Sequence, residues 1–275
     1  MTAMGLTKSR IETFQTFIFD WWKTHKRDLP WRHTHDPYKI FVSEVMLQQT
    51  QVSRVFPKYK EFLHELPTVT ALSHAPTSQV LKLWKGMGYN RRALYLKKAA
   101  EIIVHAHGGV FPKSEKDLLK LPGLGMYTAR AIQVFAYRRH VAMVDTNIRK
   151  IITRFFFDDK KQKESAIQRV ADRLVPAGRA WEWHQALMDY GAVALPKRSH
   201  PKESRGPVQP FKETDMYYRG RIMDLLRERK WKERTLISLL IHTYAKSAAY
   251  FRTLLTALTK EGLVTRVSGT VELPL

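Results

Sequence analysis

The sequence has no cysteine, few acidic residues and no long apolar run. The absence of cysteine among its 275 residues excludes disulfides, thiolate zinc sites and cysteine-ligated iron–sulfur clusters. No stretch approaches the roughly 18 apolar residues of a membrane-spanning helix, and the amino terminus has no apolar core of the signal-peptide kind. We therefore expect an intracellular protein, cytoplasmic or nucleoid-associated, with no membrane partner.

The charge balance points to a polyanionic partner. The chain has 25 Asp and Glu against 47 Lys and Arg, which leaves a formal net charge of +22. Such an excess is typical of proteins that bind nucleic acid. A generic basic protein is the alternative, but 44% hydrophobic residues and seven Trp favour a packed, enzyme-sized core.

Helical periodicity dominates the chain, and strand signals are scarce before residue 260. Apolar residues recur at helical spacing in the segments 11–23, 38–56, 78–84, 91–105, 114–119, 126–137, 147–157, 163–174 and 181–190. Proline and glycine stand at the joints between them. These segments predict an all-α bundle.

The periodicity stops at residues 195–212, which are basic and rich in proline and predict a linker or an extended DNA-facing segment. Helices are expected after it at 216–228, 235–240 and 247–261. Two short alternating runs then flank Ser268 and Gly269, as in a small β-hairpin. Three helices and a terminal hairpin predict a winged-helix-like module, which either contacts DNA or only packs against the rest of the chain.

A glycine hairpin from Leu121 to Gly125 precedes the expected helix at Met126. Glycine allows positive φ and close backbone approach, so the hairpin and helix start present unpaired N–H groups that bind phosphate well. The segment predicts a helix-hairpin-helix, with Gly123 and Gly125 as phosphate contacts. A turn of this kind is also common in proteins that bind no DNA, and the net charge favours the DNA-binding interpretation.

Two carboxylates are candidates for chemistry. Glu44 interrupts an apolar helix face beside Val45 and Met46; it is either a surface residue or a partly buried acid with a raised pKa, able to donate a proton near neutrality. Asp145 precedes a helix with apolar residues from Ile148 onward, so it is an N-cap whose anion the helix N–H groups stabilise. One proton donor and one anion are what glycosidic cleavage requires.

The same residues lie in runs that resemble MutY-type adenine DNA glycosylases of the helix-hairpin-helix base-excision superfamily. The MLQQTQV run from Met46 to Val52 is particular to the adenine branch. The matching runs, which together span residues 30 to 192, are 30–32, 36–38, 43–52, 83–89, 92–93, 121–131, 144–147 and 185–192. The resemblance implies a two-lobed helix-hairpin-helix DNA glycosylase fold. The expected parts are an N-terminal helix at 1–29 that packs with the second lobe, a lobe with the hairpin at 30–143, a second lobe at 144–195, a basic linker at 196–213 and the winged-helix-like module at 214–275.

The resemblance also implies a set of catalytic roles. Glu44 would protonate the leaving adenine of a flipped nucleotide at N7 and help to deliver water. Asp145 would stabilise the cation that develops at C1′, and Asn147 would orient the site. Tyr127 stands where bifunctional relatives of the endonuclease III type carry a Schiff-base lysine. A phenol forms no imine, so we expect a monofunctional enzyme without strong lyase activity.

Further residues match the family's binding surfaces. The base pocket is matched by Arg27, Leu29, Trp31, Arg32, Val52 and Asp189, and the residues that fill the gap or touch the opposite base by Gln49, Thr50, Met87 and Tyr89. Arg149 is a further expected DNA contact. The expected partner is double-stranded DNA with a mismatch or lesion, bound by a monomer.

Most relatives carry four cysteines for an iron–sulfur cluster, and this chain has none, which predicts a clusterless form. The basic side chains of Lys197, Arg198, Lys202 and Arg205 are expected to replace the cluster loop electrostatically. The resemblance allows a monovalent cation at the hairpin carbonyls. No metal site is predicted, because His33 and His35 stand in a polar loop of the solvent-exposed kind.

Two other functions remain open. Thymine or uracil mismatch glycosylases also carry Tyr and Asp at the positions of Tyr127 and Asp145, although Gln48 and Gln49 favour adenine. A non-catalytic lesion-binding protein is the third hypothesis, and the presence of Glu44, Asp145 and Asn147 argues against it. The carboxy-terminal residues do not resemble the Nudix-like domain that reads 8-oxoguanine in many members, so the opposite base is undecided.

Overall fold

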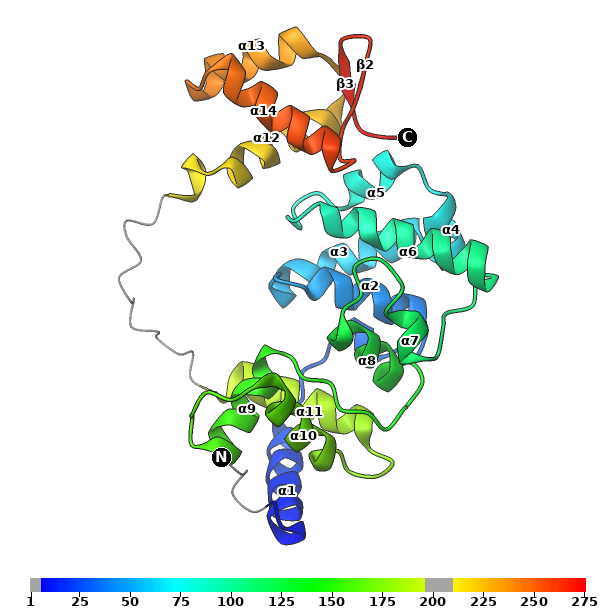
Figure 1. Cartoon of the computed structure of the whole chain (residues 1–275). Helices are drawn as coiled ribbons and strands as arrows, with labels where there is room; N and C mark the ends of the chain where they lie inside the picture. Colours follow the sequence, from blue (N-terminus) through cyan, green and yellow to red (C-terminus); the bar gives the residue numbers. More distant parts are fainter. Residues whose placement is uncertain (1–5, 196–209) are drawn as a thin grey trace. The chain divides into compact units, whose positions relative to one another are not determined.

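The structure, a computed structural model, describes residues 6–195 and 210–275 (Figure 1). Lys197, Arg198, Lys202 and Arg205 therefore lie outside the described residues. The helices are α1 (Lys8–His25), η1 (Pro30–Arg32), α2 (Pro37–Leu47), α3 (Val52–Glu65), α4 (Val69–His74), α5 (Thr77–Leu83), α6 (Arg91–His107), α7 (Glu115–Leu118), α8 (Met126–Phe135), α9 (Thr146–Phe157), α10 (Glu164–Leu174), α11 (Ala180–Val193), η2 (Phe211–Glu213), α12 (Asp215–Glu228), α13 (Glu233–Tyr244) and α14 (Ala248–Lys260). The strands are β1 (Trp231–Lys232), β2 (Thr265–Val267) and β3 (Thr270–Glu272).

The chain divides into two compact units. Unit 1 contains residues up to Glu44 and from Phe111 through α11, and unit 2 contains Val45–Val110 with the carboxy-terminal module. The predicted lobe at 30–143 thus contributes to both units, and α2 passes from one to the other. Each unit has its own buried apolar side chains, so each is described by itself below.

Unit 1 packs α1, α9, α10 and α11 together (Figure 1). Aromatic rings fill the contact between the first helix and the others: Phe14 meets Phe156 edge-on at 5.0 Å and Trp183 edge-on at 5.8 Å. Such pairs add to the free energy of apolar burial. The four helices therefore form a packed support for the loop that leads into α9.

The local sequence explains where α9 begins and ends. Asp145 is its N-cap and accepts from the Ile148 N–H at 2.6 Å, which satisfies one of the free donors of the first turn. Ile148, Ile151 and Ile152 then turn one apolar face into the core. The helix ends at Phe157 and is followed by its C-cap Asp158, whose φ of +50° is left-handed.

Unit 2 is built around α6, which packs against α4 and α5. The carboxy-terminal module follows the order α12, β1, α13, α14, β2, β3, and its antiparallel sheet has the strand order β1-β3-β2. Three helices with a terminal hairpin form the predicted winged-helix-like arrangement. Buried Ile222, Leu255 and Val271 are among its core side chains.

The predicted all-α bundle is confirmed, with local corrections. The single helix expected at 38–56 is two helices, α2 and α3, because the chain turns at residues 48–51 and Gln49 adopts a φ of +52°. The periodicity also did not indicate the helix α4 or the short strand β1. Across residues 6–195 and 210–275, no helix combines the length and the apolar character needed to cross a bilayer.

Candidate active site

Glu44 is buried in the last turns of α2. Its exposure is 4%, so the surface alternative is wrong, and the side chain is more completely buried than predicted. Burial raises the pKa of Glu44 from its ordinary value of 4.5 to about 7, the nearby charge of Asp145 raises it further, and a hydrogen bond from Tyr127 opposes the rise. A carboxyl group with a pKa in this range can hold or release its proton near neutral pH.

Tyr127 links Glu44 to the hairpin. It lies in the first turn of α8, and its hydroxyl donates to the Glu44 carboxylate. Burial and the two neighbouring carboxylates raise the pKa of Tyr127 well above its ordinary range, so the phenol stays neutral and remains a donor. The sequence suggested only that Tyr127 replaces a lysine; this contact spans 83 positions and no periodicity indicates it.

Asp145 is the third member of the cluster. Besides its bond from Ile148, it accepts backbone N–H bonds from its own residue and from Asn147. These bonds and Lys150 lower the pKa of Asp145, but burial outweighs them and the net direction is upward. The stabilising helix start is thus present as predicted, with an opposing cost of burial that the sequence did not reveal.

The helix α11 supports the segment that leads to Asp145. The buried imidazole of His184 donates from Nδ1 to the Ala180 carbonyl at 2.7 Å and accepts from the Met143 N–H at Nε2 at 3.1 Å. Burial lowers the pKa of His184 to about 4, so it is neutral, as both bonds require. Sequence reasoning missed His184, since a buried histidine has no local signature.

Gly191, also on α11, lies directly against Asn147. A Cβ built at Gly191 would stand 2.6 Å from the Cβ of Asn147 and 3.3 Å from its Cα. Only a glycine therefore allows the first turn of α9 to lie this close to α11. The two helix contacts, at residues 143 and 147, flank Asp145 on either side.

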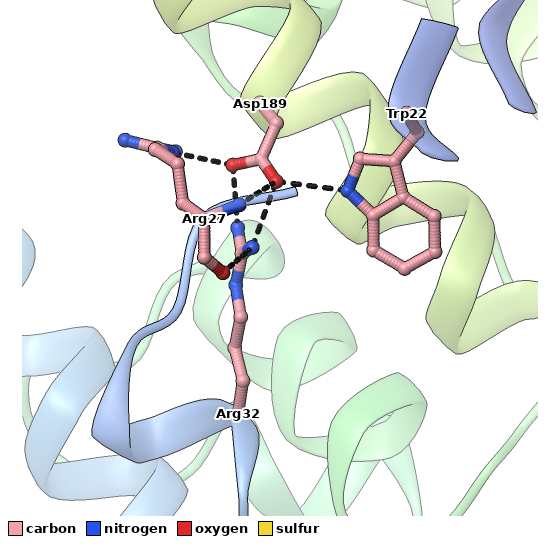
Figure 2. Close-up of polar contacts among 4 residues, drawn as sticks. All are labelled: Trp22, Arg27, Arg32 and Asp189. Atoms are coloured by element: carbon pink, nitrogen blue, oxygen red, sulfur yellow. Dashed lines mark hydrogen bonds and ion pairs between the residues drawn. The ribbon is translucent and has the colours of Figure 1, made fainter. Parts of the chain in front are cut away.

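Asp189, on the same helix, is the centre of a buried polar network (Figure 2). Arg32 donates hydrogen bonds from its two terminal nitrogens to the two Asp189 oxygens at 2.7 and 2.8 Å, and Trp22 donates from Nε1 at 2.8 Å. Arg27 donates its backbone N–H at 3.2 Å and Nε at 2.5 Å. These partners lower the pKa of Asp189 against the opposing effect of its burial.

The network changes what the predicted base pocket can do. Asp189 has no exposed surface and receives five donors, which fill the roughly four acceptor positions of a carboxylate. Leu29, Trp31 and Arg32 are buried too, whereas the Arg27 side chain is 29% exposed. In this structure Arg27 is thus the one of these five that offers substantial side-chain surface to a base. Val52 begins α3 in unit 2.

The hairpin has the geometry expected of a phosphate site. Gly123 has a φ of +80°, and Gly125 is the N-cap of α8 with no side-chain cap bond. Both glycines are exposed. The first N–H groups of α8 consequently have no capping side chain to compete with a phosphate.

In unit 2, Arg92 joins the two loops that carry the predicted opposite-base residues. Its Nη1 donates to the carbonyls of Val45, Met46 and Gln48 at 2.5–3.0 Å. Its Nη2 donates to Thr50 Oγ1 and to the Met87 carbonyl, both at 3.0 Å. Burial lowers the pKa of Arg92 to about 10, which leaves the guanidinium charged at neutral pH.

Those loops expose two side chains on left-handed backbone. Gln49 and Tyr89 have φ of +52° and +45°, conformations that cost free energy and persist only when neighbours hold them. Gln49 is exposed and Tyr89 is 50% exposed. Met87 is only 2% exposed, so its predicted contact with the opposite base is not available to its side chain in this structure. The sequence match had included Arg92 without assigning it a role.

The remaining predicted residues are placed as follows. Arg149, at 36% side-chain exposure, is ion-paired with Glu164. His33 pairs with Asp28, and His35 contacts the Phe135 carbonyl and Arg138. Within the described part of the chain, no group of three metal-ligating side chains is present.

The family model described as HhH-GPD superfamily base excision DNA repair protein matches residues 42–177. An adenine DNA glycosylase of Mycolicibacterium smegmatis is 36% identical over 233 residues, which are 77% of this chain and 79% of that protein. A thymine/uracil-DNA glycosylase of Methanothermobacter thermautotrophicus is 33% identical over 204 residues, 73% of this chain and 92% of that protein. The match to an adenine DNA glycosylase of Buchnera aphidicola, 35% identical, covers 74% of this chain and 58% of that relative's length.

A solved structure of a thermostable thymine-DNA glycosylase superposes with a TM-score of 0.65 at 31% identity, covering 70% of this chain and 92% of that one. Fold, site and relatives thus agree on one class of enzyme, the DNA glycosylases of base excision repair. The chain belongs to the HhH-GPD superfamily of base excision DNA repair proteins. It is a DNA glycosylase, and its partner is DNA.

Proposed function

We propose that the chain is a monofunctional adenine DNA glycosylase, which hydrolyses the N-glycosidic bond of an extruded adenine mispaired with 8-oxoguanine or guanine. The observation that carries the proposal is the pKa of Glu44 near 7, in contact with Tyr127 and next to Asp145. A general acid works best when its pKa lies near the working pH. Adenine has a basic ring nitrogen, N7, that can take up such a proton.

In the proposed reaction Glu44 gives its proton to N7 as the bond to C1′ breaks. The leaving adenine is thereby neutralised, and the sugar acquires positive charge. Asp145 stabilises that charge, while Asn147, held against Gly191, orients the site. Ionised Glu44 then accepts a proton from the water that attacks C1′, which restores the acid.

Tyr127 makes the proposed enzyme monofunctional. Strand cleavage by a lyase route begins with an amine that forms an imine with C1′. The residue beside Glu44 is a phenol that donates a hydrogen bond. The product should therefore be an intact strand with an abasic site.

A thymine or uracil mismatch glycosylase is the second candidate. Similarity to the Methanothermobacter enzyme and to the thymine-DNA glycosylase structure favours it. Thymine and uracil leave as delocalised anions, however, and gain less than a purine from a proton donor with a pKa near 7.

The test is single-turnover base release from duplexes that contain A:8-oxoguanine, A:G, T:G or U:G, each divided into samples with and without alkali. We expect adenine release, with strand breaks only after alkali. Release confined to thymine or uracil would establish the second candidate. Asp145→Asn should bind the A:8-oxoguanine duplex without turnover; binding unchanged in both proteins, with no release by either, would indicate a non-catalytic lesion-binding protein.

The proposal includes the composition of the working enzyme. It is a monomer on double-stranded DNA without an iron–sulfur cluster, and the hairpin carbonyls at residues 121–125 hold a monovalent cation. Its place of action is the cytoplasm or nucleoid. Light scattering of the DNA complex tests whether the enzyme is a monomer. Iron analysis of the purified chain tests the absence of an iron–sulfur cluster.

A further inference from the structure

Unit 2 contains a groove of about 1200 Å³ between the loops held by Arg92 and the first helix of the carboxy-terminal module. One wall consists of residues 48–49 and 86–92. The other wall includes Phe211 and the α12 residues Met216, Tyr217 and Arg221. The groove is large enough for a nucleotide with its phosphates, since small-ligand sites measure roughly 300–1,000 Å³.

The two walls are fixed to each other. Arg227 of α12 is 9% exposed, and it donates from Nε to the Leu81 carbonyl at 2.9 Å and from Nη2 to Asn90 Oδ1 at 2.8 Å. Its third nitrogen pairs with Asp224 at 2.8 Å. Asn90 follows Tyr89 directly, so α12 is anchored beside the residue with the left-handed backbone.

The lining of the groove is cationic. Arg54 is exposed and has no ion-pair partner among the described residues, and Arg221 is 46% exposed. The acidic lining residues are Asp224 and Glu261, and both are paired with arginine. The groove therefore has a net positive charge, which suits phosphates.

Aromatic and apolar side chains stand between these cations. Tyr89 is 50% exposed, Met216 53% and Phe211 62%, and the Tyr217 ring lies 5.5 Å from the Arg221 guanidinium. Exposed rings interleaved with arginines are the pattern on which unpaired bases stack while their phosphates are neutralised.

Paired DNA offers no base face to such rings, because its bases are stacked. A glycosylase that extrudes one nucleotide leaves the opposite base without a partner. Gln48 and Gln49, which belong to the first wall, follow Glu44 in the chain by only four and five residues. The unpaired nucleotide opposite the extruded one is thus the part of the substrate with the chemistry that the groove would bind.

We propose that α12 forms the second wall of a site for this unpaired nucleotide, with Met216 and Tyr217 against the base and Arg221 toward its phosphates. The inference rests on the proposed function only in requiring that a nucleotide be extruded. It gives the winged-helix-like module a DNA contact through its first helix rather than through its hairpin.

Photo-crosslinking tests the contact directly. p-Benzoylphenylalanine is introduced in place of Met216 in the full chain, with the same group in place of Val267 as control; Val267 is 56% exposed on β2 and does not line the groove. The probe is a duplex with an uncleavable 2′-fluoroadenosine opposite 8-oxoguanine or guanine. We expect position 216 to crosslink to the complementary strand at the nucleotide opposite the adenosine. Crosslinks to the target strand, none at all, or efficient crosslinking only from position 267 would overturn the proposal.

A charge variant gives an independent measurement. Arg221→Gln leaves Asp224 paired with Arg227, and the control Arg252→Gln removes an exposed arginine from α14 outside the groove. Loss of one phosphate contact should reduce the slope of log affinity against log salt by about 0.9 for Arg221→Gln alone. An unchanged slope, or equal changes in both variants, would contradict the assignment. Absence of adenine release with the crosslink intact would refute only the proposed base, whereas release without the crosslink would refute only the role of α12.

Discussion

Glu44 should destabilise the folded protein above neutral pH, because the fold raises the pKa on which its chemistry depends. Folded Glu44 binds its proton more tightly than the unfolded chain does, with a pKa of about 7 against 4.5. Its contribution to stability is therefore complete below pH 4.5 and is lost as the pH rises through 7. At about 1.4 kcal/mol per tenfold change in proton binding, the loss reaches about 3 kcal/mol.

Glu44→Gln removes this loss while its side-chain oxygen still accepts from Tyr127. The variant should be as stable as the parent near pH 4.5 and more stable by about 3 kcal/mol near pH 9. Its rate of base release should fall by about 10²–10⁴-fold, as expected when a general acid is removed. The variant thus exchanges activity for stability.

The assay is urea unfolding of parent and variant at pH values from 4.5 to 9, with Glu65→Gln as a control at an exposed position. When the free energies of unfolding of two proteins are compared at the same pH, the contributions of the other titrating groups cancel. A stability difference that is the same at both ends of the range would refute the burial argument. A variant that loses stability at high pH would show that Glu44 is ionised and paired rather than neutral.

Three further substitutions test the supports of the site. Gly191→Ala places a methyl group 2.6 Å from the Asn147 Cβ, so the single-turnover rate should fall at least tenfold with little change in DNA affinity, whereas Val193→Ala, at an exposed position of the same helix, should leave both unchanged. Asp189→Asn leaves Arg32 buried without a counter-charge and should cost about 3–5 kcal/mol of stability by urea unfolding; a loss below 1 kcal/mol, or one equal to that of exposed Asp20→Asn, would contradict the network. Arg92→Lys cannot supply bonds to both loops and should weaken binding to mismatched DNA more than it lowers the rate on bound substrate; loss of rate alone would argue against its role in holding Gln49 and Tyr89.

Local sequence patterns predict most of the helices of the fold. Helix spacing and caps placed α9 and α11 to within a few residues, since both depend on neighbours in the chain. The turn at residues 48–51 was missed because the apolar pattern continues across it, and only a left-handed Gln49 breaks the helix. The strand β1 has two residues, too few for any alternation to be visible.

The candidate site was predictable in its carboxylates but not in its supports. Glu44 stood out because a charge in an apolar run needs an explanation, and Asp145 because a cap precedes a periodic helix. The supports join segments that are far apart in sequence. Tyr127 donates a hydrogen bond to Glu44, His184 accepts one from the Met143 N–H, and Gly191 contacts Asn147. Such contacts follow from tertiary packing, which no local spacing encodes.

A single helix, α11, accounts for how the anionic half of the site is held in place. Asp189 ties that helix to the residues that follow α1, through Arg27 and Arg32. His184 and Gly191, on the same helix, fix the backbone on either side of Asp145. A carboxylate that stabilises developing charge works best when its position is set before the reaction. In the proposed reaction the buried network at Asp189 therefore contributes by positioning Asp145, and among the predicted base-pocket residues of unit 1 Arg27 keeps the most side-chain surface.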